Sequence, residues 1–389
     1  MFIIKILACQ EIIFLLAFRS LRSHGSRKKT IFCQVFTWIM KKYKSKVVRV
    51  GKYLLGGNNP VRVQSMCDTD TRDVKATVKQ ILALEKAGCE IIRVAVLDMV
   101  AAKAIGKIKK QIHFPLVADI HFDYKLALEC VTQGIDKIRI NPGNIGSKEK
   151  VAAVVKVCKA KKIPIRIGVN VGSIEKDLQA KYGPTPKAAV ESALRHVKIL
   201  EDLNFRDILI SIKFSDVQQM VEGYRLLAKK VNYPLHLGIT HAGTTYMGTM
   251  KNAIGIGILL HEGIGATIRV SLTADPCEEV KAGFAILNAV GVRKYGPELI
   301  SCPTCGRTEI DLIGLATKVE KVLTGIKKPL KIAVMGCVVN GPGEAREADI
   351  GIAGGKKAGA IFVKGKVLRS VSEDKLFSEF LKELKKISK

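Results

Sequence analysis

Residues 91–140 read IIRVAVLDMVAAKAIGKIKKQIHFPLVADIHFDYKLALECVTQGIDKIRI, and this stretch decides the fold. It contains three short runs that are rich in β-branched residues, at 91–96, 115–120 and 137–140. The segments between these runs are long enough for a helix and read as amphipathic. Nearly continuous apolar strands that alternate with helices are typical of a parallel sheet buried on both faces. The stretch therefore predicts consecutive βα units.

The same alternation continues on both sides of this stretch. Five more strands are expected, at 61–66, 164–169, 207–213, 234–240 and 267–272. Amphipathic helices are expected between the strands, for example at 74–87, 188–200, 217–229 and 278–288. Eight βα units are the number that closes a (β/α)8 TIM barrel of roughly 250 residues. The predicted fold class is therefore α/β, with a TIM barrel as its main part.

The alternation stops near residue 295. Beyond it we expect a helix at 310–323, strands at 331–336, 361–364 and 366–371, and a Lys-rich closing helix at 374–387. This order of elements predicts a small α+β domain. The chain is accordingly divided into an extension at 1–46, a barrel domain at 47–295 and the α+β domain at 296–389.

The extension differs in composition from the rest of the chain. Residues 1–52 hold 12 basic side chains and one acidic side chain. A targeting segment would have such a composition, and so would residues upstream of a true translation start at Met40. No apolar run approaches the ~20 residues that a membrane-spanning helix needs, so no membrane association is expected.

The overall charge favours anionic partners. Across 389 residues, 64 Lys and Arg face 35 Asp and Glu, which gives a formal net charge of +29. Phosphorylated metabolites and nucleic acid are both compatible with this charge. A basic nucleic-acid-binding protein is the weaker interpretation, because only 6% of the residues are aromatic and the basic residues of interest lie on barrel strands.

Polar side chains gather at the ends of the predicted barrel strands, where TIM barrels carry their chemistry. The candidates for substrate binding are Arg93, His121, Arg139, Arg166, Asn170, Lys213, Arg269 and Ser271. Arginine binds phosphate well because its planar fork can bond two oxygens at once. The pattern predicts a phosphate or diphosphate site at the barrel mouth. The alternative is internal pairing of these cations, for instance with Asp119 or Asp216.

Most of the ten cysteines are isolated, and their number is too small for a disulfide scaffold. We therefore expect a reducing compartment, the cytoplasm. Three cysteines differ from the others. Cys302 and Cys305 form the motif CPTC, and Cys337 lies in GCVVNGPGE. Two cysteines at positions i and i+3 can bind one metal centre, and a third at a strand end can complete it.

The identity of that centre stays open at this point. Zinc usually requires a fourth Cys or His, whereas no His follows His261 and no Cys follows Cys337. An iron–sulfur cluster can be held by three thiolates and one other ligand. Glu344 lies seven residues after Cys337 and can supply a weakly held oxygen ligand, which suits an iron that must also bind substrate. A structural zinc and incidental thiols remain as alternatives.

Nine motifs together resemble the 4-hydroxy-3-methylbut-2-enyl diphosphate synthase family of the non-mevalonate isoprenoid pathway. They are VQSMCDTDT, PLVADIHFDY, KIRINPGNIG, PIRIGVNVGS, SIKFSDV, HLGIT, IRVSLTADP, CPTCGR and GCVVNGPGEA. The match runs from about Val47 to Val363 and is similar to the compact bacterial form. It implies a TIM barrel followed by a small α+β iron–sulfur domain. It also implies two-electron reductive ring opening and dehydration of 2-C-methyl-D-erythritol 2,4-cyclodiphosphate.

The resemblance also implies roles for particular residues. A 4Fe–4S cluster would be held by Cys302, Cys305, Cys337 and Glu344, and Glu344 counts as catalytic as well. The diphosphate of the substrate would be bound by the strand-end residues already named. Flavodoxin or ferredoxin would donate the electrons. The active species would be a homodimer in which the cluster domain of one subunit caps the barrel of the other.

One position departs from the family. The family typically reads Thr-Glu-Ala-Gly after the seventh strand, and the Glu is thought to handle protons. This chain has Thr240, His241, Ala242 and Gly243 there. An imidazolium can donate a proton, so His241 is the candidate for the catalytic acid. The alternative is that His241 only fills space. A phosphate-binding barrel with a structural zinc is the competing interpretation of the whole chain.

Overall fold

The structure is a computed structural model that describes the chain apart from residues 1–42, 141–144, 146, 338–342, 344–345 and 389. Most of the predicted extension and the candidate ligand Glu344 therefore lie outside the described residues. None of the described helices is both long and apolar enough to cross a bilayer.

Eight parallel strands form the main sheet. They are β3 (Arg62–Met66), β4 (Ile91–Val96), β5 (Leu116–Ile120), β6 (Lys137–Ile140), β7 (Ile165–Asn170), β8 (Ile208–Lys213), β9 (His236–Leu237) and β10 (Thr267–Ile268). Their order is β8-β7-β6-β5-β4-β3-β10-β9, and a parallel bridge between Ile210 and Leu235 closes the sheet into a barrel. The predicted TIM barrel is confirmed, and six of the eight strands begin and end within one residue of their expected bounds.

Strands β9 and β10 are shorter than expected. A side chain at Gly238, directly after β9, would place its Cβ 2.4 Å from the backbone oxygen of Arg269. The two segments therefore approach each other closely there, and the N–H of Arg269 donates to the Leu237 oxygen at 2.9 Å. The chain then continues toward the barrel mouth with Ile239 and Thr240.

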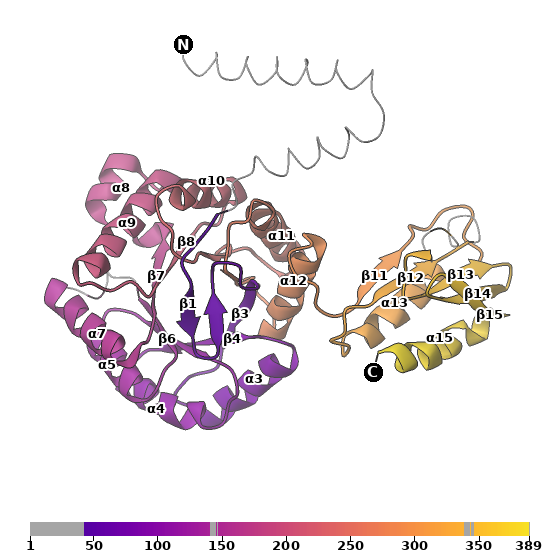
Figure 1. The fold of residues 1–389 in the computed structure, drawn as a ribbon, viewed down its shortest axis with the longest axis horizontal. Coiled ribbons are helices and arrows are strands. Elements are labelled where there is room, and N and C mark those ends of the chain that lie inside the picture. The colour runs from indigo at the N-terminus through magenta and orange to yellow at the C-terminus, as the bar shows by residue number, and fades with distance from the viewer. Residues whose placement is uncertain (1–42, 141–144, 146, 338–342, 344–345, 389) are drawn as a thin grey trace, which may run out of the picture.

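Helices surround the barrel (Figure 1). They are α3 (Val74–Lys86), α4 (Met99–Lys109), α5 (Tyr124–Thr132), α7 (Lys148–Lys161), α8 (Lys176–Tyr182), α9 (Pro186–Asp202), α10 (Val217–Ala228), α11 (Thr245–His261) and α12 (Pro276–Ala289). Five of these helices begin with an Asp whose side chain accepts a backbone N–H of the first turn. These aspartates are Asp73, Asp98, Asp123, Asp216 and Asp275. Such caps satisfy N–H groups that a helix leaves free.

A hairpin covers the amino-terminal end of the barrel and was not predicted. Its strands β1 (Val48–Val50) and β2 (Tyr53–Leu55) are antiparallel. Val48, Val50 and Leu55 pack in one buried cluster with Ile91, Val117, Leu209 and Ala266 at the start of barrel strands. The hairpin therefore seals one end of the barrel and leaves the carboxyl ends of the strands as its mouth.

A second sheet follows the barrel. Its order is β11-β12-β13-β14-β15, with β11 (Glu298–Ser301), β12 (Lys331–Met335), β13 (Ile350–Gly355), β14 (Ala358–Val363) and β15 (Lys366–Ser372). The helices α13 (Leu312–Leu323) and α15 (Glu373–Ile387) share a buried apolar cluster with these strands. This mixed sheet with two helices confirms the predicted α+β character. Strands β11 and β13 were not predicted.

Candidate active site and metal centre

Cations from four barrel strands point into the barrel and are nearly buried. Arg93, Arg139, Arg166 and Lys213 are between 1% and 8% exposed. Register pairs place Asp119, Arg139 and Arg166 side by side on β5, β6 and β7. Because side chains alternate along a strand, residues in this register share the inner face. The structure thus brings together residues that the sequence predicted for one site.

Asp119 is the centre of this group. Its carboxylate accepts a hydrogen bond from Arg139 Nη1 at 2.9 Å and lies 3.6 Å from Arg93 Nη1. His121 Nε2 lies 3.4 Å from the same carboxylate and 3.1 Å from Arg139 Nη1. Burial opposes ionisation, but the charge of Arg93, the His121 hydrogen bond and the charge of Arg139 outweigh it and hold the pKa of Asp119 well below its usual range. Asp119 is therefore a fixed anion that orients two arginines and one histidine.

Internal pairing accounts for part of the site. Arg269 forms a two-point ion pair with Glu279 of α12, with Nε and Nη2 at 3.1 and 2.9 Å from the two carboxylate oxygens. Glu279 also accepts hydrogen bonds from Ser65 Oγ and the backbone N–H of Leu272. Asp216, the other partner considered from the sequence, caps α10 instead. Asp119 and Glu279 thus hold three of the cations.

The remaining cations have no carboxylate partner among the described residues. Arg166 is 1% exposed, and its Nε and Nη1 have no hydrogen-bond partner in this part of the chain. Burial, followed by the charges of Arg269 and Arg93, lowers the pKa of Lys213 well below its usual value. Unpaired buried charge is costly, so the arrangement indicates that an anion belongs here.

Two glycines make room for these side chains. A Cβ at Gly168 would lie 2.3 Å from Arg139 Nε, and a Cβ at Gly238 would lie 2.9 Å from Lys213 Nζ. The carbonyl oxygen of Gly168 also accepts a hydrogen bond from Arg139 Nη2 at 3.1 Å. Glycine at these two positions therefore leaves the space inside the barrel that the side chains of Arg139 and Lys213 occupy.

The other predicted residues lie at the carboxyl ends of their strands. Asn170 ends β7 and pairs in register with Lys213. Ser271 follows β10, and its hydroxyl donates to the backbone oxygen of Ile239 at 2.5 Å. His241 lies four residues beyond β9, is exposed, and has a left-handed backbone with φ of 52°. A positive φ outside glycine is uncommon, so this position holds a constrained backbone at the mouth.

The predicted metal ligands follow adjacent parallel strands. Ser301 of β11 pairs in register with Val334 of the parallel strand β12. Cys302 and Cys337 therefore both follow the carboxyl ends of these two adjacent strands. The sulfur of Cys302 accepts a hydrogen bond from the backbone N–H of Gly336 at 3.2 Å. Hydrogen bonds from backbone N–H groups to ligand sulfurs are a feature of protein-bound iron–sulfur clusters.

Cys305 lies in an exposed turn closed by Thr308, whose hydroxyl accepts the N–H of Cys305 at 3.2 Å. The backbone N–H and then the side chain of Arg307 lower the pKa of the Cys305 thiol. The thiolate is the form that binds metals, so this donor set fits a thiolate-ligated centre. Among the described residues no three Cys, His, Asp or Glu side chains converge to hold a metal ion. Glu344 lies outside the described residues.

Two buried polar residues near the site, Glu279 and Lys137, were not predicted from the sequence. Glu279 lies on the buried face of the predicted helix 278–288, where a charged residue signals a partner. Lys137 lies two residues before Arg139 on β6 and shares its inward face. In both cases the signal was a charged residue at a position that periodicity assigns to the core.

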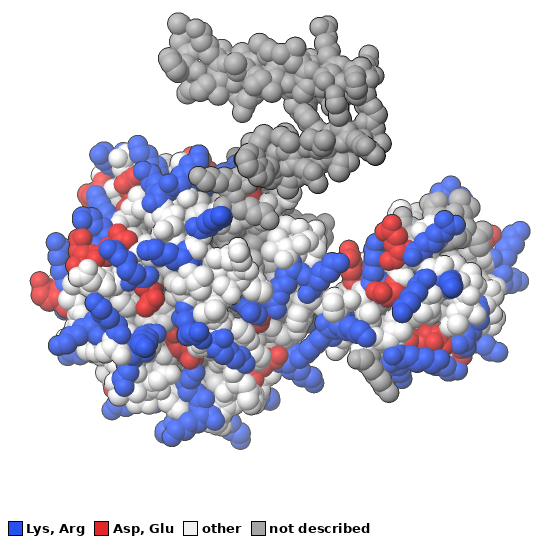
Figure 2. Space-filling view, in the orientation of Figure 1, with Lys and Arg blue, Asp and Glu red and all other residues white. Residues whose placement is uncertain are grey.

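The surface charge has no single focus in the view of Figure 2. Lys and Arg cover both parts of the molecule and are interspersed with Asp and Glu. A continuous basic stripe, which nucleic-acid-binding proteins commonly present, is not visible on this face.

Comparison with known proteins places both parts of the chain in one family. Residues 45–284 match the model of the GcpE TIM-barrel domain, and residues 298–386 match that of the GcpE protein C-terminal domain. The 4-hydroxy-3-methylbut-2-en-1-yl diphosphate synthase (flavodoxin) of Clostridium perfringens is 61% identical over 349 residues, which are 90% of this chain and 100% of that protein. The enzyme of the same name from Caldanaerobacter subterraneus is 61% identical over 88% of this chain and 97% of its own length. The enzyme of this name from Geobacter sulfurreducens is 57% identical over 89% of this chain and 98% of its own length.

Proposed function

Because the chain belongs to the GcpE family, we propose that it opens the ring of 2-C-methyl-D-erythritol 2,4-cyclodiphosphate reductively and yields 4-hydroxy-3-methylbut-2-enyl diphosphate. The protein is an oxidoreductase of non-mevalonate isoprenoid biosynthesis. The reaction takes two electrons and releases one oxygen of the substrate as water.

The excess of buried cations in the barrel mouth carries this proposal. Arg166 and Lys213 lack carboxylate partners among the described residues, while Arg93 and Arg139 share Asp119. A diphosphate would supply the missing negative charge, and its oxygens would accept hydrogen bonds from the unpaired N–H groups of Arg166. The same group becomes the leaving group when the ring opens, so the cations that bind it also stabilise the charge that develops there.

The remaining mouth residues orient the substrate. We assign Asn170, Ser271 and His121 to this task because they lie at strand ends beside the cations. The Ser271 hydroxyl already donates to Ile239, which leaves its oxygen available as an acceptor. Arg269, which Glu279 holds by two bonds, contributes a fixed donor at the same rim.

The cysteines after the barrel would hold a 4Fe–4S cluster. Cys302, Cys305 and Cys337 are the thiolate ligands in this proposal, and Glu344 is the fourth ligand. A cluster of this type, when bound, supplies the electrons for the reduction. The hydrogen bond from Gly336 to Cys302 and the lowered pKa of Cys305 support thiolates at these positions. The cluster-binding part corresponds to residues 296–389, and the substrate-binding part to residues 47–295.

The electron donor is a small redox protein. The names of the curated relatives specify flavodoxin, and we extend that donor to this chain, with ferredoxin as the alternative. All eight cysteines in the described part of the chain are free thiols. A reducing compartment such as the cytoplasm suits both these thiols and the donor.

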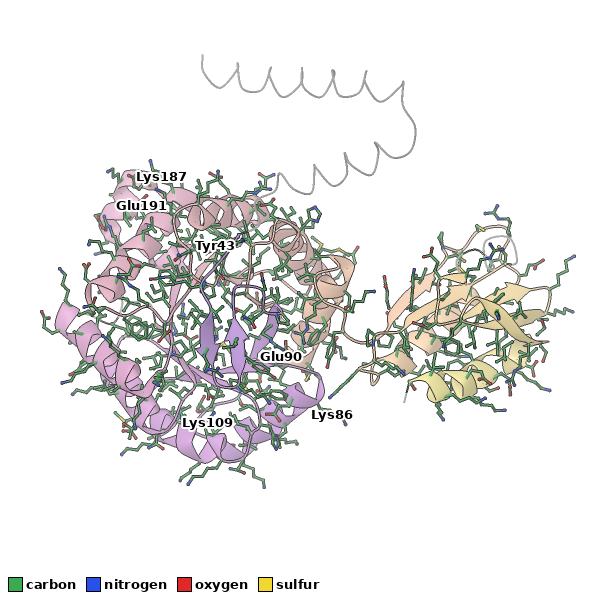
Figure 3. All side chains as sticks on the ribbon, viewed as in Figure 1. Tyr43, Lys86, Glu90, Lys109, Lys187 and Glu191 are labelled. Carbon is green, nitrogen blue, oxygen red and sulfur yellow. The ribbon has the colours of Figure 1, made fainter. Side chains whose placement is uncertain are left out.

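The linker after α12 supports a homodimer. Arg293 donates to the backbone oxygen of Val61 at 3.0 Å and forms a two-point ion pair with Glu90, which is labelled in Figure 3. Tyr295 stacks on Phe284 with ring centroids 3.7 Å apart. Val61 and Glu90 directly precede β3 and β4, so the linker is fastened at the amino-terminal end of the barrel.

The mouth lies at the opposite end of the strands. Cys302 follows Tyr295 by only seven residues, which span at most ~25 Å when fully extended. Folding back around the barrel would use most of that length, whereas a second subunit can present its cysteines directly. We therefore assign the cluster-binding part of one subunit to the mouth of its partner.

Replacing His241 tests the proposed proton donor. His241→Asn retains a residue type that tolerates a left-handed backbone but cannot transfer protons, and it should lower kcat by roughly 10²–10⁴ with little effect on substrate binding. His241→Glu, which restores the carboxylate typical of the family, should keep most of the activity. Steady-state kinetics under anaerobic conditions measures both. A kcat of the Asn variant close to that of the unmodified protein would show that His241 only occupies space.

A barrel that binds phosphorylated ligands and carries a structural zinc is the competing function. It explains the cations of the mouth, but it gives no role to the redox activity that the names of the relatives specify. Metal analysis of protein purified without oxygen separates the two. Iron and sulfide in stoichiometric amounts support the proposal, while zinc alone supports the rival function.

A further inference from the structure

The barrel contains a lysine below the site just described. Lys137 is the first residue of β6, two positions before Arg139 on the same inward face, and it is 0% exposed. Since strand ends point toward the mouth, Lys137 lies one step deeper in the barrel than Arg139. The hairpin β1–β2 closes the barrel beneath this level.

The surroundings of Lys137 contain donors and cations but no acid. Its Nζ donates to Gln64 Oε1 at 3.3 Å, and no carboxylate lies within ion-pair distance in the described part of the chain. Arg166 and Arg93 are the charged groups that act on it, and both are cations. The amide nitrogen Nε2 of Gln64 is also buried, and it has no hydrogen-bond partner among the described residues. The interior below the mouth is therefore rich in donors and poor in acceptors.

His236 of β9 is a further titratable group near Lys137, and burial followed by the charges of Arg166, Lys213 and Lys137 lowers the pKa of its imidazole. On the neighbouring strand β5, the apolar Val117 lies in register with Lys137. Burial is the largest effect on Lys137 and lowers the pKa of its ammonium group well below the usual value, followed by Arg166 and Arg93. Among the described residues, no carboxylate offsets the cost of burying the charged lysine in the ligand-free barrel.

We propose that Lys137 is a positioning residue for the anion in the mouth, one that destabilises the ligand-free barrel and strengthens diphosphate binding without touching the ligand. This proposal rests on the proposed function, because the ligand it favours is the diphosphate held by Arg139 and its neighbours. A positive charge in a dry interior attracts an anion over several ångströms far more strongly than it would in water. When no anion is bound, burial and the neighbouring Arg166 and Arg93 disfavour the charged form of Lys137.

Two variants test the proposal on the full chain. Lys137→Met keeps the length of the side chain without its charge, and Lys137→Gln also keeps a polar group beside Gln64. Lys103→Met, on the exposed face of α4, is the matched control. Thermal unfolding without ligand gives stability, and calorimetric titration with inorganic pyrophosphate gives affinity. Steady-state kinetics with the cyclodiphosphate gives KM and kcat.

We expect opposite changes in stability and affinity. Both Lys137 variants should melt about 2–4 °C higher than the unmodified protein in the absence of ligand. Their Kd for pyrophosphate should be about tenfold higher, because the variants lack a positive charge that attracts the anion through the protein interior. KM should rise more than kcat falls. Lys103→Met should change none of these quantities.

Two results would overturn the proposal, and they are distinguishable. A lower melting temperature with unchanged pyrophosphate affinity would mean that Lys137 only supports the packing of the barrel, while the anion site itself remains. Absence of pyrophosphate binding to the unmodified protein would remove the anion site and with it the proposed function of the mouth.

Discussion

Cys305→Ser should give a colourless and inactive protein whose barrel still folds. Cys305 lies in an exposed turn far along the chain from the barrel, and its hydrogen-bonded neighbours in this turn are Thr308 and Arg307. Serine fits the same turn, so the fold should tolerate the change. A hydroxyl binds iron much more weakly than a thiolate does. The proposed site has only three cysteine ligands, so this change would leave two.

Iron and sulfide analysis, the visible absorption spectrum and far-ultraviolet circular dichroism provide the measurements. We expect loss of cluster absorption and of turnover, with an unchanged secondary-structure spectrum. Cys277→Ser is the matched control, because Cys277 is a partly exposed thiol on the first turn of α12 that is assigned no ligand role. A full iron and sulfide load in Cys305→Ser would contradict the assignment of the ligands.

Arg139→Ala should weaken substrate binding more than any other single change in the mouth. Arg139 is 5% exposed and contacts Asp119, His121 and the Gly168 carbonyl. Truncation would leave part of the diphosphate charge unbalanced in a largely desolvated site. Removing one partner of such a pair costs ~2–5 kcal/mol, which corresponds to a rise of roughly 30- to 5,000-fold in Kd.

Titration with the cyclodiphosphate measures this effect directly. Arg195→Ala is the control, since Arg195 is half-exposed on α9 and pairs only with Asp177 in the described ion pairs. The cluster absorption of Arg139→Ala should match that of the unmodified protein, because no predicted metal ligand lies on the barrel. An unchanged Kd in Arg139→Ala would remove this residue from the site.

Mixing the two inactive variants tests the arrangement of the dimer. If one subunit supplies the cysteines and its partner the mouth, a heterodimer of Cys305→Ser and Arg139→Ala contains one intact combination. Random exchange of subunits should then restore roughly a quarter of the activity, since half of the dimers are mixed and each has one working site of two. Activity that stays at zero after exchange, verified by mass spectrometry of the mixed dimer, would favour a site built within one chain.

The barrel could be predicted from sequence because its strands carry a local signal. Runs such as IIRVAV at 91–96 and DILISIK at 207–213 are apolar and β-branched, and helices of regular period separate them. The charged residues within these runs also predicted the site, because alternation along a strand puts Arg93 and Arg139 on the inner face. These features depend on neighbours in the sequence alone.

The missed elements depend on contacts that are distant in the sequence. Strands β1 and β2 have three residues each and are stabilised by packing against the barrel floor. Strand β13 reads IGIAGG, and glycine weakens the local preference for a strand, so its parallel pairing with β12 decides its state. The pairing of β11 with β12 likewise brings Cys302 near Cys337, which spacing alone could not establish.

The ion pairs of the mouth were predictable only in part. Asp119 was a candidate because it lies on a barrel strand, whereas Glu279 reaches Arg269 from a helix packed outside the sheet. Such a contact depends on how α12 packs against β3 and β10, and periodicity gives only the buried face of the helix. The pairing of Asp216 with a mouth cation was wrong, because a local helix cap uses that carboxylate.

Anaerobic turnover of the cyclodiphosphate tests the central claim most directly. The protein is purified without oxygen, its iron and sulfide are determined, and it is incubated with 2-C-methyl-D-erythritol 2,4-cyclodiphosphate and a chemical reductant. We predict formation of 4-hydroxy-3-methylbut-2-enyl diphosphate, identified by mass spectrometry, and two electrons consumed for each product molecule. An iron- and sulfide-loaded protein that binds the cyclodiphosphate but leaves it unchanged would contradict the proposed function.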